Sequence, residues 1–137
     1  MSHQIESLYL GELRTEATHF ASQNKIITDA PTDNNGKGEA FSPTDLVCAA
    51  LGSCMMTIMG IVAERDKVNL QGVTWKTTKV MASNPRRIAE IHVHFYFPSS
   101  LPLESTYKQK LENAARTCPV ALSLAPEIKQ EVFFHYA

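Results

Sequence analysis

The stretch SPTDLVCAALGSCMMTIMGIVA, residues 42–63, decides how this chain folds. Residues 46–63 carry no charge over 18 positions, which is the length of a short membrane-spanning helix. Glycines, small polar residues and two cysteines lie within it, and strand-like sequence flanks it on both sides. We therefore expect a central helix that is buried in the protein rather than one that spans a membrane.

The start of this helix is marked by three residues. Ser42 is a good N-cap, Pro43 suits the first helical position, and Asp45 follows three residues after the cap, as in a capping box. The helix should end at about residues 64–67, where charged side chains return. Because it is apolar on nearly all sides, it must be covered all round, and a domain this small can need a second subunit to cover it.

The rest of the chain reads as a mixture of strands and helices. Periodicity and turn residues predict strands within 6–29, a polar loop at 31–41, strands at 68–82 and 87–97, a helix at 102–117, a helical turn at 119–124 and a strand at 131–136. Strands and helices do not alternate in this order as they would in a doubly wound fold. We therefore expect one α+β domain over residues 1–137, with antiparallel sheet packed around the central helix.

The composition is that of an ordinary globular protein and limits the possible partners. With 44% apolar residues, 20% charged residues and a net charge of −1, nothing favours a nucleic acid or a membrane surface as partner. The first residues lack the basic start and apolar run of a signal peptide. Three cysteines, an odd number, argue against a structural disulfide framework. The cytoplasm is the expected location.

Cys54 and Cys118, 64 positions apart, are the candidate reactive residues. A reactive cysteine needs a nearby positive charge or a helix N-terminus, because the thiolate is the reactive form. Cys54 lies about eleven residues into its helix, roughly 16 Å from the positive end, so it needs a cation from elsewhere. Arg14, the one arginine before the central helix, is the candidate. The plainer alternatives are that Cys54 is a small core residue and Arg14 a solvated charge.

The other thiols differ in their surroundings. Cys118 precedes Pro119, which ends one helix and can begin the next, so its thiolate should be favoured by an N-terminus. It also continues the apolar face of the helix at 102–117 and should point inward. Cys48 lies on a different side of the central helix from Cys54 and is expected in the core.

Histidines raise the question of a metal site. His92 and His94 lie on the same face of one predicted strand, and His19 and His135 lie on other strands. No cysteine or carboxylate stands at ligand spacing from them. We expect no metal site and no bound cofactor.

Two motifs of the sequence resemble those of a known family. FSPTDLVCAALGSCMMTIMG (41–60) and ARTCPVALSL (115–124) resemble the osmotically inducible protein C / organic hydroperoxide resistance (OsmC/Ohr) family, and the order of elements is similar over nearly the whole chain. The resemblance implies antiparallel sheets wrapped around long central helices in an intertwined homodimer. It also implies a thiol peroxidase for organic hydroperoxides, with Cys54 as the peroxidatic and Cys118 as the resolving cysteine. An external dithiol, of the lipoyl type in some members, would reduce the disulfide.

The resemblance also assigns a role to Arg14 and exposes a departure. In the family an arginine stabilises the thiolate and is itself held by a glutamate, and Arg14 lies about where that arginine is expected. The position usual for the glutamate is Thr44 here, followed by Asp45. Asp45 is a possible partner for Arg14, and its other interpretation is the capping box.

Two further hypotheses compete with the peroxidase. The chain could share the fold without significant peroxidase activity and bind a small hydrophobic or thiol-reactive ligand, which the departure at Thr44 favours. It could also be a structural or interaction protein in which both cysteines are inert core residues.

Overall fold

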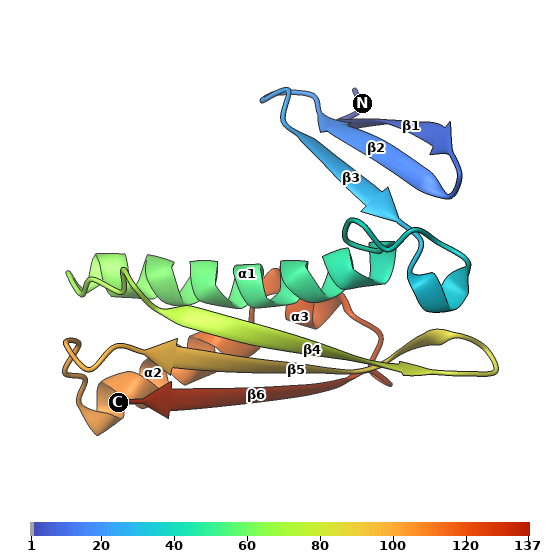
Figure 1. Ribbon diagram of the computed structural model, residues 1–137. Coiled ribbons are helices and arrows are strands. Elements are labelled where there is room, and N and C mark those ends of the chain that lie inside the picture. The colour runs from blue at the N-terminus through green and yellow to red at the C-terminus, as the bar shows by residue number, and fades with distance from the viewer. Residues whose placement is uncertain (1) are drawn as a thin grey trace. The chain divides into compact units, whose positions relative to one another are not determined.

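The computed structural model describes residues 2–137, and the chain divides into two compact units (Figure 1). One unit ends at Val47 and the other comprises Cys48–Ala137. The boundary falls within the long helix α1 (Pro43–Arg65), a few residues after its start. The single domain expected over residues 1–137 stays a prediction.

The N-terminal unit contains an antiparallel sheet of three strands in the order β1-β2-β3. The strands are β1 (Ile5–Gly11), β2 (Arg14–His19) and β3 (Lys25–Asp29). They confirm the strands predicted within 6–29. The short 3-10 helix η1 (Thr32–Asn34) follows in the predicted loop.

This first sheet has little apolar core of its own. The buried side chains of the described N-terminal residues are Thr28, Asp29 and Ser42, all of them polar. Large apolar side chains of the sheet and its turns are instead exposed: Ile5, Leu8, Tyr9, Leu10, Leu13, Phe20 and Ile26. So much exposed apolar surface is typical of a region that packs against something else.

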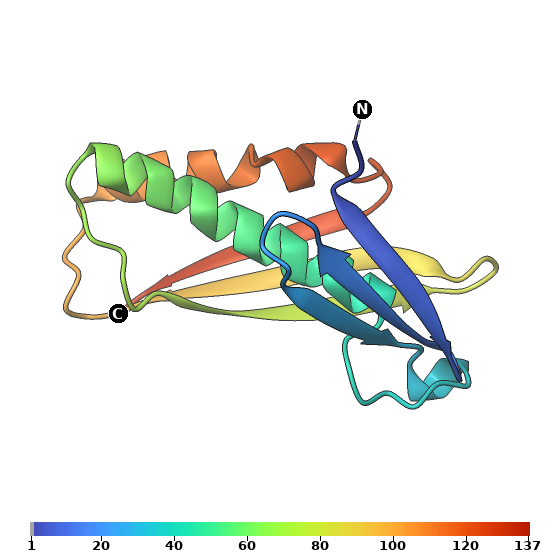
Figure 2. The ribbon, with the colours of Figure 1, turned by 90° about the horizontal axis from the view of Figure 1, so that it is seen from above.

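The C-terminal unit is a three-stranded sheet with helices on one face (Figures 1 and 2). Its remaining elements are β4 (Thr74–Ala82), β5 (Arg87–Phe97), α2 (Ser105–Arg116), α3 (Pro119–Ser123) and β6 (Lys129–Tyr136). β4 and β5 are antiparallel, but β6 runs parallel to β5. The purely antiparallel arrangement that we expected is therefore wrong for this pair. α2 and α3 lie between the two strands in the chain, and such a crossover is what parallel neighbours require.

The core lies between this sheet and the helices. Strand β5 alternates, so that Ile91, Val93 and Phe95 are fully buried while the residues between them face the other side. They share one apolar cluster with Met55 and other residues of α1 and with Leu111 and Ala115 of α2.

Two elements begin later than their periodicity predicts. β4 starts at Thr74 rather than at 68, because the backbone first closes the end of α1, where Val68 N–H donates to Ala63 O at 2.8 Å. A turn follows, in which Gln71 N–H donates to the side chain of Asn69 at 2.9 Å. Helix α2 starts at Ser105 rather than at 102, since Glu104 is still extended.

Helix α1 has the predicted start but is covered on one side only. Ser42 N–H donates to Asp45 Oδ2 at 3.0 Å, and Asp45 N–H donates to Ser42 Oγ at 3.1 Å, which is a complete capping box. The core side includes Leu51, Met55 and Met59. The opposite stripe is exposed and consists of Ala50, Ser53, Thr57, Ile61 and Glu64.

Helix α1 also meets the criteria of a membrane-spanning helix, so its place inside the protein stays a prediction. By length and composition the helix could cross a membrane, a test that the core helix of a soluble protein also passes. One side of the helix packs into the core cluster with β5 and α2.

Candidate active site

Cys54 and Cys118 lie side by side in the C-terminal unit. Cys54 lies within α1, Cys118 is the N-cap residue of α3, and Cys54 lies near enough to raise the pKa of Cys118. Both are free thiols. The fold therefore brings together the two predicted cysteines, which share the apolar cluster of the C-terminal unit.

The environment of Cys118 favours a protonated thiol. Its side chain has no solvent exposure, and its sulfur accepts a hydrogen bond from Ala121 N–H at 3.4 Å. Burial raises the pKa of Cys118, the N–H groups of the α3 N-terminus oppose this, and the contact with Cys54 raises it further. The helix N-terminus that we predicted is present, but the expectation of a favoured thiolate is wrong, because burial outweighs the N–H donors.

Cys54 is the more accessible thiol of the pair. It is half-buried, whereas Cys118 and Cys48 are buried. Cys48 belongs to the core cluster, as predicted. A solute can therefore reach Cys54 first.

Arg14 is held by two carboxylates of the N-terminal unit. Its Nε donates to Asp29 Oδ1 and its Nη2 to Asp29 Oδ2, both at 2.7 Å, and Nη2 also donates to Glu39 Oε1 at 2.9 Å. The hydrogen bonds from Arg14 lower the pKa of Asp29, although burial of that carboxyl opposes the shift. Correspondingly, the bonds to Asp29 raise the pKa of Arg14. Arg14 is thus a fixed, permanently charged guanidinium.

Asp29, rather than the predicted Asp45, is the carboxylate that binds Arg14 in a bidentate manner. Asp45 closes the capping box at the start of α1, which is the other interpretation that the sequence allowed. The sequence analysis missed Asp29 and Glu39. Asp29 could have been found from the sequence. If β2 and β3 form a hairpin around the turn between them, residue 14 lies opposite residue 29.

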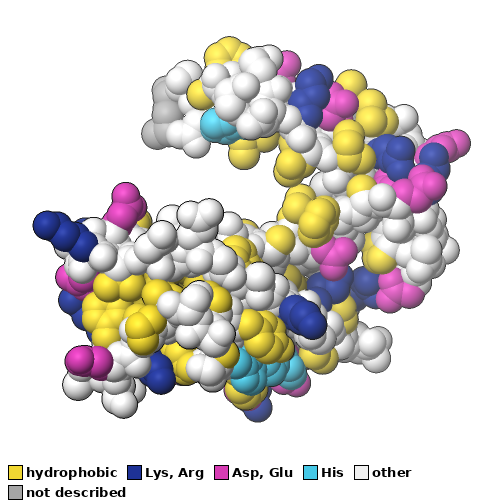
Figure 3. Space-filling view, turned by 60° about the vertical axis from the view of Figure 1, so that its left-hand side comes forward, with side chains coloured by type: hydrophobic (Ala, Val, Ile, Leu, Met, Phe, Trp, Pro, Cys, Tyr) yellow, Lys and Arg dark blue, Asp and Glu magenta, His cyan; other side chains and the backbone are white. Residues whose placement is uncertain are grey.

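The histidines of the C-terminal unit gather on the outer face of the sheet (Figure 3). His94 Nδ1 and His135 Nε2 lie 2.9 Å apart with ring planes only 4° from parallel, so that one N–H joins the two rings. His92 instead contacts Glu90 at 2.9 Å. Among residues 2–137, no group of three or more metal-binding side chains comes together.

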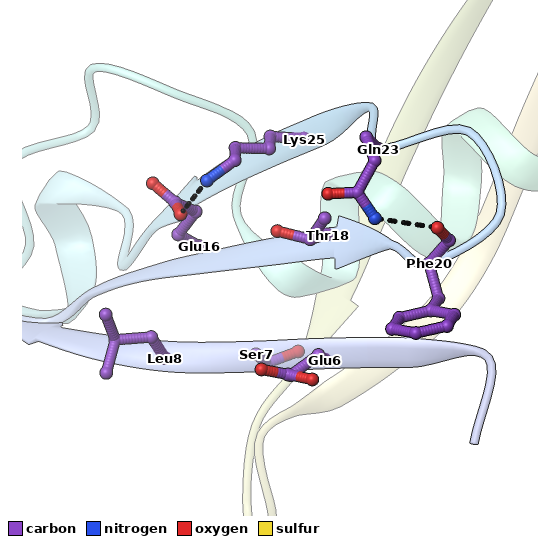
Figure 4. A pocket seen from close by; sticks show the side chains of 8 residues that line it. All are labelled: Glu6, Ser7, Leu8, Glu16, Thr18, Phe20, Gln23 and Lys25. Atoms are coloured by element: carbon purple, nitrogen blue, oxygen red, sulfur yellow. Dashed lines mark hydrogen bonds and ion pairs between the residues drawn. The ribbon is translucent and has the colours of Figure 1, made fainter. Parts of the chain in front are cut away.

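Neither of two further cavities has a cysteine in its lining. One, of about 320 Å³, lies over the first sheet (Figure 4). An ion pair of Lys25 with Glu16 at 3.0 Å spans part of it. The other is a groove of about 490 Å³ along the outer side of α1, lined by residues that include Met56, Thr57, Gly60, Val68, Leu70 and Trp75.

The fold and the thiol pair define the class of protein: an α+β protein with two neighbouring cysteines, one on a central helix and one before a short helix. The OsmC-like protein family model matches residues 36–132. A structure from Psychrobacter arcticus 273-4, which bears the provisional name of an osmotic stress induced and detoxification response protein, is 47% identical. It superimposes with a TM-score of 0.94 over 98% of this chain and 97% of that chain. The chain therefore belongs to the OsmC-like protein family.

More distant structures share the fold. The organic hydroperoxide resistance protein OsmC of Legionella pneumophila is 16% identical with a TM-score of 0.75, over 97% of both chains. An organic hydroperoxide resistance protein of Elizabethkingia anophelis is 14% identical with a TM-score of 0.75, over 100% of this chain and 99% of that chain. None of the curated proteins is similar enough to this chain to count as a match.

Proposed function

We propose that this protein is a cysteine-based peroxidase that reduces organic hydroperoxides to alcohols. The observation that carries the proposal is that Cys54 and Cys118, residues 64 positions apart in the chain, are neighbours in the core of the C-terminal unit. Membership of the OsmC-like family supports it, as do the names of structural neighbours that are organic hydroperoxide resistance proteins.

The reaction has two steps on the enzyme. The Cys54 thiolate attacks one oxygen of ROOH, the O–O bond breaks, and RO⁻ leaves and takes up a proton as ROH, so that Cys54 becomes a sulfenic acid. The sulfur of Cys118 then attacks the Cys54 sulfur. The hydroxyl of the sulfenic acid leaves with the Cys118 proton as water, and a disulfide remains. The net reaction consumes one hydroperoxide and two thiols.

The environments of the two thiols suit these different roles. Burial and a raised pKa keep Cys118 protonated and out of reach of the peroxide, so it does not compete for the substrate. While protonated, its S–H group can donate to the Cys54 sulfur, which stabilises negative charge there. Arg14 would supply the formal positive charge that Cys54 lacks on its own helix.

We also propose a reductant and a cellular location. An external dithiol, possibly of the lipoyl type, reduces the disulfide by thiol–disulfide exchange. The neutral composition leaves nucleic acid and membranes outside the set of proposed partners. We propose a cytoplasmic location, where such a disulfide is transient.

We also propose that the protein acts as a homodimer. The exposed stripe on α1 borders the groove that Gly60 lines. A Cβ at Gly60 would meet nothing within 4 Å, so packing within this subunit does not require a glycine that costs the helix about 1 kcal/mol. A second copy that packs on this side would explain the glycine and the groove. The first sheet has exposed apolar surface of its own that a second copy could cover.

The test follows loss of cumene hydroperoxide with dihydrolipoate as reductant. We expect turnover by the wild type and by Cys48→Ala, the matched control on the same helix, and none by Cys54→Ser. Cys118→Ser should reduce the first equivalent of peroxide and then stop. No turnover by the wild type would overturn the proposal, and full activity of Cys54→Ser would overturn the assignment of the nucleophile.

The second candidate function is binding of a small hydrophobic or thiol-reactive ligand without turnover. The groove beside α1, with Met56, Leu70 and Trp75 in its wall, favours it. A wild type that is inactive in the peroxidase assay but changes Trp75 fluorescence on binding an apolar ligand would support this function instead.

A further inference from the structure

Strand β6 places a polar side chain in a row of residues that otherwise faces the core. Val132 and Phe134 pack against the core cluster, and Gln130, two positions before Val132, belongs to the same row. In the parallel register Gln130 pairs with Ile91, which is fully buried. A polar side chain at such a position needs a hydrogen-bonding partner, because burial without one costs free energy.

The partner of Gln130 is the backbone of α3. Gln130 Nε2 donates to Ala121 O at 3.0 Å. Helix α3 ends at Ser123 and Leu124 is already extended, so residue 125, which would donate to Ala121 O in a longer helix, lies beyond its end. Gln130 therefore supplies from β6 a donor that a longer helix would supply itself.

The same residue of α3 contacts the sulfur of Cys118. Ala121 N–H donates to Cys118 Sγ at 3.4 Å. The backbone of Cys118 is fixed on both sides, because its N–H donates to Ala115 O at 3.3 Å and its C=O accepts from Leu122 N–H at 3.1 Å. Two hydrogen bonds in sequence, from Gln130 to Ala121 and from Ala121 to Cys118, thus join strand β6 to the sulfur.

Negative charge develops on the Cys118 sulfur when it attacks Cys54, because the thiol gives up its proton in that step. The side chain of Cys118 has no solvent exposure, so water does not solvate this charge. Burial raises the pKa of Cys118, and the N–H groups of Ala121 and Val120 oppose this effect. An N–H group that is already held at the sulfur stabilises the charge without reorganisation.

We propose that Gln130 is a positioning residue for the formation of the disulfide. It holds the backbone at Ala121, so that the N–H of this residue stays on the Cys118 sulfur while the sulfur attacks Cys54. The S–S bond forms, the S–O bond of the sulfenic acid breaks, and the hydroxyl leaves with the Cys118 proton as water. The inference deepens the proposed function and rests on it, since it takes this disulfide as the second step of the peroxidase reaction.

The test measures the second step by competition. Reduced protein receives one equivalent of cumene hydroperoxide in the presence of dimedone, which traps the Cys54 sulfenic acid before Cys118 reaches it. Mass spectrometry without reduction gives the ratio of the dimedone adduct to the disulfide, and loss of hydroperoxide gives the rate of the first step.

Gln130→Met has a similar length but no donor. It should raise the ratio of adduct to disulfide about fivefold, the rate equivalent of one hydrogen bond, and leave the first step unchanged. Gln109→Met is the matched control, because Gln109 donates to Asn113 on an exposed part of α2. It should leave the ratio and the rate as they are in the wild type.

Three further measurements separate positioning from a purely structural role. The pH profile of disulfide formation should move to higher pH in Gln130→Met, because a loosened Ala121 N–H lets the pKa of Cys118 rise. In the Cys118→Ser background, Gln130→Met should not change the rate of trapping by dimedone. Gln130→Asn keeps an amide that is one methylene shorter, so it should act as Gln130→Met does even if the latter folds poorly.

Different results overturn the inference and the proposed function. A wild-type ratio in both Gln130→Met and Gln130→Asn, equal slowing of both steps, or faster trapping in the Cys118→Ser background would each overturn the inference while peroxide turnover stands. A wild type that consumes no hydroperoxide, or that forms no disulfide between Cys54 and Cys118, would remove the premise and the inference with it.

Discussion

At the scale of single residues, two aspartates differ in what the sequence reveals about them. Asp45 bonds to a residue three positions away, so the capping box was predictable from local spacing. Asp29 reaches Arg14 across a hairpin, 15 positions away, and this contact depends on the register that the turn sets. Arg14 was therefore predictable as a candidate cation, whereas Asp29 could be found only through the hairpin register and Glu39 had no such signal.

The ion pair of Asp29 with Arg14 predicts a pH dependence in acid. The pKa of Asp29 is lowered by the hydrogen bonds from Arg14, so its contribution to stability is fully present above the unfolded pKa of about 3.9. This contribution is lost as the pH falls through the lower folded pKa. The melting temperature should fall between about pH 4 and pH 2 more steeply for the wild type than for Asp29→Asn. Parallel curves in that range, followed by circular dichroism, would contradict the assignment.

The pKa of Cys118 depends on more than the residues next to it in the sequence. The helix N-terminus at Cys118 was predictable from Pro119, but the direction of the pKa shift was not. Burial decides that direction, and the burial of Cys118 depends on how α2 and α3 pack against the sheet.

At the scale of elements, α1 shows which features of a helix a sequence encodes. Its start, its length and its apolar character were predictable, because capping residues and composition are local. Which side faces the core was not, since nearly all sides are apolar. The parallel pairing of β6 with β5 was missed for a related reason: strand direction depends on the crossover through α2 and α3.

Gly52 packs tightly against strand β4, and this contact supplies a prediction. A Cβ at Gly52 would lie 2.8 Å from Trp75 Nε1, so Gly52→Ala should destabilise the protein by roughly 1–3 kcal/mol despite the better helix propensity of alanine. Urea unfolding measures the effect. The double variant Gly52→Ala/Trp75→Leu should lose less than the sum of the two single variants, because the smaller side chain relieves the clash. Additive losses would show that the contact with Trp75 is not the cause.

At the scale of the whole molecule, the distribution of buried apolar residues favours a second copy of the chain. The buried apolar side chains of the described residues all lie between Cys48 and Ala121, while the first sheet and one side of α1 are exposed. We expect sedimentation to give twice the subunit mass of 15.2 kDa. Gly60→Leu should weaken association by filling the groove, and Thr78→Leu, which adds the same side chain at an exposed site on β4, should not. A wild type that sediments at the subunit mass would refute the dimer.

One measurement tests most directly whether Cys54 and Cys118 form a redox-active pair. The wild type is treated with one equivalent of cumene hydroperoxide in the absence of reductant, the remaining thiols are blocked, and the peptides are mapped by mass spectrometry without reduction. We predict a disulfide between Cys54 and Cys118, with Cys48 recovered as a free thiol. Recovery of all three cysteines as free thiols, or oxidation of Cys54 to sulfinic acid while Cys118 stays free, would contradict the account.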